Sequence, residues 1–151
     1  MTTVLVPLTE DTLDRFAAMV EQMYLDDPSE QPMSRERARH QAARMLHEDR
    51  GLALPMLVHA DGQTVGYVIV VPFLSNEFGG RIAVLDEVFV MPSLRGRGHG
   101  TAAIQAAVAW ARERGFRFVM LEVNDRNVRA RALYQRLGFV AQARRTMSLP
   151  L

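Results

Sequence analysis

The stretch from Ile82 to Ala103 constrains the fold most, because it joins an apolar strand, a glycine-rich turn and the start of a helix. Apolar residues dominate Val84 to Val90 without regular alternation, and such a run predicts a strand that is covered on both faces. Two carboxylates, Asp86 and Glu87, interrupt it. After Pro92, three glycines fall within five residues, and good helix formers then begin. The pattern predicts a strand whose end leads through a turn into a helix.

The glycine-rich turn has the composition of an anion-binding site. Gly96, Gly98 and Gly100 leave backbone amides free near the positive end of the helix that follows. Each glycine also raises the entropic cost of ordering the turn, which argues against a connector that binds nothing. We therefore expect a cofactor that carries a phosphate or pyrophosphate.

Two known phosphate-binding patterns can be compared with this turn. A Walker-type loop requires a lysine after its last glycine, and all 18 basic residues of this chain are arginine, so that pattern is excluded. A dinucleotide fingerprint, G-x-G-x-x-A, fits Gly98 to Ala103, with Glu122 about 20 residues further on. That fingerprint turns directly off its strand, whereas residues 92–95 intervene here. A small dinucleotide-binding oxidoreductase stays open as an alternative.

Composition excludes several other classes of function. A chain of 151 residues is the size of one domain with a sizeable core, so we expect a single domain over residues 1–151. A net charge of +1 gives no reason to expect nucleic acid or an acidic membrane surface as a partner. The absence of cysteine excludes an acyl-cysteine intermediate, and the four histidines lack metal-ligand spacing. We expect a cytoplasmic protein without metal, and a homodimer is an open alternative.

The order of elements predicts a mixed sheet. Val4–Val6 is a short strand, and a helix with apolar residues at helical spacing follows, for which Asp11 is the expected N-cap. A second helix is expected from Arg35 to about Asp49, capped by Ser34. The later segments are a hairpin of strands 52–60 and 64–73, the strand from 82, a helix from 98, a strand over 118–123, a short helix ending at 138 and a terminal β segment over 139–149. The fold expected is α/β, antiparallel at its start and βαβ at its end, with helices on both faces.

A second motif lies beyond the crossover, in the pattern N-x-x-A-x-x-L-Y-x-x-L-G-F from Asn127 to Phe139. Helical spacing turns Tyr134 inward with Leu133 and Leu137, and Asn127 is a suitable N-cap. Together with Arg95-x-x-Gly98-x-Gly100, this pattern resembles the GNAT family of acetyl-CoA-dependent N-acetyltransferases. Two such motifs in this order, one βαβ unit apart, are far more specific than either alone.

The resemblance implies a role for each residue of the two motifs. The pantetheine arm of acetyl-CoA would pair with the backbone of Val88, Phe89 and Val90. The pyrophosphate would lie on the turn formed by Arg95, Gly96, Arg97, Gly98, His99, Gly100 and Thr101. Asn127 would contact the cofactor arm, and the Tyr134 hydroxyl would protonate or stabilise the departing thiolate. The acceptor would be a primary amine of a small molecule or peptide, which attacks directly.

The general base is not fixed by the sequence. A carboxylate in a covered strand is costly unless it is paired or lies in a cleft, and a raised pKa would suit Glu87 to take a proton from an ammonium group. An ion pair with Arg81 or another arginine is an equal alternative. Glu122 matches the position of an acid in GNAT enzymes that acetylate protein N-termini. A non-catalytic acyl-CoA-binding regulator on the same fold is a further alternative.

Overall fold

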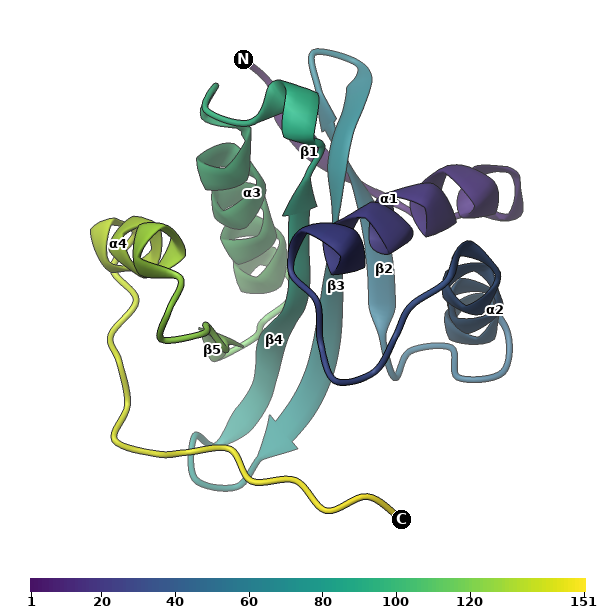
Figure 1. Cartoon of the computed structure of the whole chain (residues 1–151). Coiled ribbons are helices and arrows are strands. Elements are labelled where there is room, and N and C mark those ends of the chain that lie inside the picture. Colours follow the sequence, from purple (N-terminus) through teal and green to yellow (C-terminus); the bar gives the residue numbers. More distant parts are fainter.

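A five-stranded mixed β-sheet forms the centre of the structure, with helices on both faces (Figure 1). The computed structural model describes residues 1–151. The strands lie in chain order and are β1 (Thr3–Pro7), β2 (Leu54–Ala60), β3 (Gln63–Ser75), β4 (Gly80–Val90) and β5 (Phe118–Leu121). The helices are α1 (Leu13–Asp26), α2 (Arg35–Leu46), α3 (His99–Glu113) and α4 (Val128–Arg136). The predicted α/β fold with a mixed sheet is confirmed.

The first four strands are antiparallel neighbours. The β2–β3 hairpin turns through Asp61 and Gly62, which have φ angles of 48° and 81°. Asp-Gly suits such a turn, because glycine adopts positive φ without a steric penalty and aspartate tolerates it better than most residues. The hairpin predicted from this dipeptide is therefore present.

The end of the sheet is a parallel crossover, as predicted. β4 leads through a short 3-10 turn (Pro92–Leu94) and the glycine-rich turn into α3, and β5 then pairs parallel to β4. Pairing runs from Ile82 with Phe118 only as far as Leu85 with Leu121. From residue 86 onward, β4 is paired on the β3 side alone. The two strands therefore separate just before the glycine-rich turn.

Each face of the sheet has its own core. On one face, α1 and α2 cover a cluster that includes Phe16 and Tyr67, both nearly or wholly inaccessible to solvent. On the other, α3 inserts Ile104 among strand residues such as Val68, and α4 packs partly buried side chains against the same cluster. Figure 1 shows α1 crossing one face of the sheet while α3 and α4 lie on the other. Both faces of the central strands are thus covered, as their apolar sequence requires.

Some of the predicted boundaries are wrong. Asp11 is not the N-cap of α1, because it lies inside a 3-10 turn (Glu10–Thr12) that runs directly into the helix. The second helix ends at Leu46 rather than near Asp49, although Ser34 caps it as predicted, accepting a hydrogen bond from the Arg37 amide at 3.1 Å. None of the helices is both long enough and apolar enough to cross a membrane.

The predicted terminal β segment over 139–149 is also wrong. Residues 140–151 form no backbone hydrogen bond, and the chain lies extended beside the β3–β4 hairpin and β5 (Figure 1). Side chains attach it instead. Arg144 makes two hydrogen bonds to Glu77, at 3.0 and 3.1 Å, and Thr146 donates to Glu122. Its apolar residues therefore stay exposed, with Val140 86% and Met147 93% accessible.

Gly66 is required where β3 meets the end of β4. A Cβ atom added there would lie 1.9 Å from the Phe89 carbonyl oxygen. We predict that Gly66→Ala lowers the free energy of unfolding by about 1–3 kcal/mol, since one strand must move to relieve this overlap. Chemical denaturation measures the effect. Gln63→Ala, at an exposed position of the same strand, is the control and should change stability by less than about 0.5 kcal/mol; equal stability of the two variants would contradict the prediction.

Candidate functional site

The glycine-rich turn presents a row of unpaired backbone donors. None of the amides from Gly96 to Thr101 donates a hydrogen bond to another protein group, whereas the Ala102 amide bonds to the Gly98 carbonyl at 3.0 Å. Gly96 and Gly98 have φ angles of 78° and 85°, and a Cβ atom at either would meet nothing within 4 Å. Open space thus lies beside the N-terminus of α3. Free amides and a helix dipole together favour an anion there.

The side chains around the turn differ in direction. Arg95 points back to the protein: its Nε donates to the Val90 carbonyl at 2.9 Å, and its Nη2 lies 2.5 Å from Asp26 Oδ2. This hydrogen bond is the main cause that lowers the pKa of Asp26. Arg97 is exposed and makes no ion pair, and the half-buried His99 has a buried Nδ1 without a partner. The Arg97 side chain is therefore available to a ligand, whereas the His99 Nδ1 is inaccessible and Arg95 already has protein partners.

The separated end of β4 borders this turn. Phe89 is buried on the α1 face, 3% exposed, while Val88 and Val90 are half-buried. Because β5 has already left the sheet, the edge of β4 from Asp86 to Val90 lacks a strand on that side. A ligand with amide groups can pair with such an edge in the manner of a strand.

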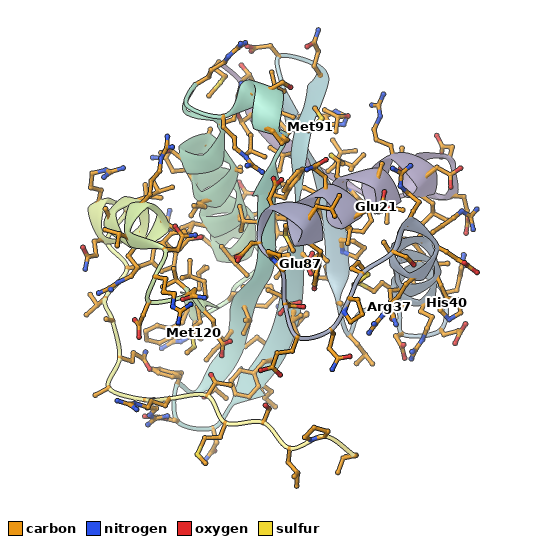
Figure 2. All side chains as sticks on the ribbon, viewed as in Figure 1. Glu21, Arg37, His40, Glu87, Met91 and Met120 are labelled. Atoms are coloured by element: carbon orange, nitrogen blue, oxygen red, sulfur yellow. The ribbon has the colours of Figure 1, made fainter.

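A β-bulge in β4 determines where its carboxylates point. Val70 pairs with Leu85 and Ile69 with Glu87, so Asp86 is the extra residue. The bulge reverses the alternation: Leu85 packs on the α3 face, and Phe89 packs on the α1 face. Glu87 therefore faces α1, next to its C-terminal end (Figure 2).

Two tyrosine hydroxyls hold Glu87. Tyr24 of α1 donates to Oε1 at 2.9 Å, and Tyr67 of β3 donates to Oε2 at 2.8 Å. Burial raises the pKa of Glu87, the two hydrogen bonds oppose that rise, and Asp86 adds to it. Burial and the nearby carboxylate raise the pKa of Tyr24 to about 12, so Tyr24 remains a donor. The alternative of an ion pair with Arg81 is wrong, because Arg81 donates to the Arg114 carbonyl at 2.7 Å instead.

Asp86 lies near Glu87, and Glu122 lies near Asp86. Burial raises the pKa of Asp86, and the charge of Glu122 raises it further. Glu122 follows β5 directly, is exposed, and accepts a hydrogen bond from Thr146. No arginine or histidine lies within ion-pair distance of Asp86, Glu87 or Glu122. Three carboxylates without a cationic partner thus lie where β4 and β5 separate.

The second motif folds as its sequence predicts. Asn127 caps α4, its Oδ1 accepting a hydrogen bond from the Ala130 amide at 3.0 Å. Tyr134 turns inward with Leu133 and Leu137 and packs edge-on to Phe139, with ring centres 5.9 Å apart. Its hydroxyl has no protein partner, and burial raises its pKa. A protonated hydroxyl therefore lies beside the core on the α3 face.

Local sequence patterns do not identify the two tyrosines that hold Glu87. Tyr24 fits the apolar spacing of the first expected helix, and Tyr67 lies within the strand expected over 64–73. A tyrosine at a fully buried position needs a hydrogen-bond partner, and a covered strand that carries a carboxylate can supply one. That complementarity was the available signal, but the bulge that makes the groups meet is not visible in the sequence.

Comparisons with known proteins agree with this arrangement. Residues 17–139 match the Acetyltransferase (GNAT) family. An uncharacterized N-acetyltransferase of Methanocaldococcus jannaschii is 42% identical over 80 residues, which is 52% of this chain and 35% of that protein. An aminoglycoside N(6')-acetyltransferase type 1 of Klebsiella aerogenes is 31% identical over 99 residues, which is 63% of this chain and 65% of that protein. The matches thus span less than two thirds of these relatives.

Solved structures share the fold over almost the whole chain. A possible acetyltransferase from Clostridium difficile superposes with a TM-score of 0.85 at 13% identity, covering 100% of this chain and 99% of that one. The aminoglycoside N-acetyltransferase AAC(6')-Iy, solved with CoA, has a TM-score of 0.76 at 19% identity, with 99% and 95% covered. On the match of residues 17–139, which is most of its length, the chain belongs to the Acetyltransferase (GNAT) family.

Proposed function

We propose that this chain is an N-acetyltransferase that moves the acetyl group of acetyl-CoA to a primary amine of a small molecule or peptide. The observation that carries the proposal is the row of unpaired amides from Gly96 to Thr101 beside an unpaired edge of β4. The pyrophosphate of acetyl-CoA can bind the row of free amides. Its pantetheine arm, which has two amide groups, can pair with the open edge of β4. Membership in the family and a structural neighbour solved with CoA support the same assignment.

The residues of the turn fit the charge and shape of a pyrophosphate. The amides from Gly96 to Thr101, that of His99 included, would donate hydrogen bonds to its oxygens, and the exposed Arg97 would add positive charge. Arg95 would act indirectly, holding the turn to Val90 and Asp26 rather than binding phosphate with its side chain. The backbone from Val88 to Val90 would pair with the arm, and Asn127 would contact it while capping α4.

Acetyl-CoA, when bound, supplies an acetyl thioester; the chain supplies orientation and proton handling. Holding an amine against the thioester replaces a bimolecular encounter and is the main contribution to the rate. Glu87, whose pKa burial raises, is the proposed base for the acceptor ammonium group, with Glu122 as the second candidate. Tyr134 offers a protonated hydroxyl to the departing thiolate.

The unpaired acids Asp86 and Glu122 favour a cationic acceptor. Relatives are named as acetyltransferases of aminoglycosides, thialysine and mycothiol, which are small amines. The direct test is CoA release from acetyl-CoA with kanamycin, thialysine, spermidine, free amino acids and an N-terminal peptide. Turnover with at least one amine is expected. Binding of acetyl-CoA without turnover on any amine would favour the non-catalytic acyl-CoA-binding regulator.

A dinucleotide-binding oxidoreductase is not favoured. A 3-10 turn (Pro92–Leu94) separates β4 from the glycines, whereas the dinucleotide fingerprint turns directly off its strand. Acetyl-CoA and CoA should therefore raise the melting temperature, while NAD and NADP should not. At a ligand concentration of 100 times the dissociation constant, binding adds about 2.7 kcal/mol to the free energy of unfolding.

Gly98→Val should weaken CoA binding by about tenfold or more, since a side chain would enter the space next to the free amides. Gly79→Val is a matched control: Gly79 also has a positive φ, 67°, and open space around it, but lies in the β3–β4 loop. Both variants carry the same backbone strain, so both should lose stability. Calorimetry measures the affinity of each folded variant for CoA. Equal affinities would contradict the proposed cofactor site.

Tyr134→Phe should lower kcat by about 10²-fold, at the low end of general acid catalysis, because the thiolate would lose its proton donor. The ring stays, so stability and CoA affinity should change little. Gln135→Ala, exposed on the same helix, is the control and should keep the wild-type kcat. If Tyr134→Phe turns over as fast as that control, Tyr134 has only a packing role.

A further inference from the structure

We propose that Tyr24 is the residue through which Glu87 takes the proton of the acceptor amine, so that α1 contributes directly to the chemistry. The inference rests on the proposed function, in which Glu87 is the base. It concerns a residue of α1 that lies outside both sequence motifs, and it follows from how the two oxygens of Glu87 are covered.

Each oxygen of Glu87 accepts a hydrogen bond, but only one of the two donors reaches solvent. Oε2 is held by Tyr67, which is fully buried and also contacts Met23 Sδ at 3.1 Å. Oε1 is held by Tyr24, which is half-buried near the C-terminal end of α1. Figure 2 shows Glu87 beside this end of the helix. Of the two donors, only Tyr24 is therefore accessible enough to link an acceptor amine to Glu87.

The Tyr24 hydroxyl can transfer the proton and keep its own protonation state, because it gains one proton as it loses another. The ammonium group gives a proton to the Tyr24 oxygen while the Tyr24 O–H proton moves to Glu87 Oε1. The products are a neutral amine, an intact tyrosine and a protonated Glu87, so atoms and charge balance. The amine nitrogen is then free to attack the thioester carbon.

The end of α1 is fixed where this transfer needs it. Asp26, two residues after Tyr24, pairs with Arg95, which also donates to the Val90 carbonyl and stacks on the Phe89 ring, its Cζ 5.4 Å from the ring centre. A residue of the glycine-rich turn thus holds the last turn of α1 against the end of β4. The position of Tyr24 is linked to the cofactor side of the site through Arg95.

The charged and titratable groups around the Tyr24–Glu87 pair come from three elements. Asp86 on β4 and Arg37 on α2 act on Tyr24 in opposite directions, and Tyr67 on β3 faces Glu87 from the other side. The two tyrosine hydrogen bonds lower the pKa of Glu87. Removing either one raises it, so the acidic limb of the kcat/KM profile moves to higher pH, because the base must be ionised.

The test compares Tyr24→Phe with Tyr67→Phe, using the most active amine of the panel above. Both variants should move the acidic limb to higher pH. Only Tyr24→Phe should also lower the plateau of kcat/KM, by about 10²-fold, because it alone removes the path of the proton. Tyr67→Phe should lower the plateau far less.

A second arm separates proton transfer from a packing role. With a fluorinated analogue of the same amine, neutral at pH 7, no proton has to leave before the nitrogen attacks, and Tyr24→Phe should recover to within a few-fold of wild type. A deficit equal for both amines, or wild-type kinetics for Tyr24→Phe, would overturn the relay while leaving acetyl transfer intact. A wild-type chain without turnover on any amine would overturn the proposed function, and the relay with it.

Discussion

The β-bulge at Asp86 is the feature on which the site depends. One extra residue in β4 shifts the side-chain alternation, so that Leu85 packs on the α3 face and Glu87 faces α1. Pairing with β5 stops at the same place, which leaves the following edge of β4 open. A regular strand would place Glu87 on the same face as Leu85, away from both tyrosines. A single insertion therefore places a half-buried, hydrogen-bonded carboxylate beside an open strand edge.

The two halves of the site are linked rather than merely adjacent. Free amides lie at the N-terminus of α3, while Glu87 lies further back on β4 under the end of α1. Arg95 bridges them, because it belongs to the glycine-rich turn yet bonds to Val90 and Asp26. In the proposed enzyme, the element that receives the cofactor is thereby attached to the helix that lines the acceptor side.

Much of the fold could be predicted from sequence because its signals are local. The Asp61-Gly62 turn, the Ser34 and Asn127 caps and the inward face of Tyr134 all depend on a few neighbouring residues. The bulge, the Tyr24–Glu87 contact and the direction of Arg95 could not be predicted, since each joins segments far apart in the chain. The β segment predicted over 139–149 is absent, because a strand needs a backbone partner and residues 140–151 have none.

The central claim is that the amides from Gly96 to Thr101 hold the pyrophosphate of acetyl-CoA. A two-dimensional ¹⁵N NMR titration with CoA tests it most directly, because it observes each amide separately. The resonances of Gly96, Gly98 and Gly100 should shift most, in proportion to bound CoA, while that of Gly79, in the β3–β4 loop at the opposite end of β4, should stay unchanged. Shifts confined to residues outside 88–101, or none at these three glycines at saturating CoA, would contradict it.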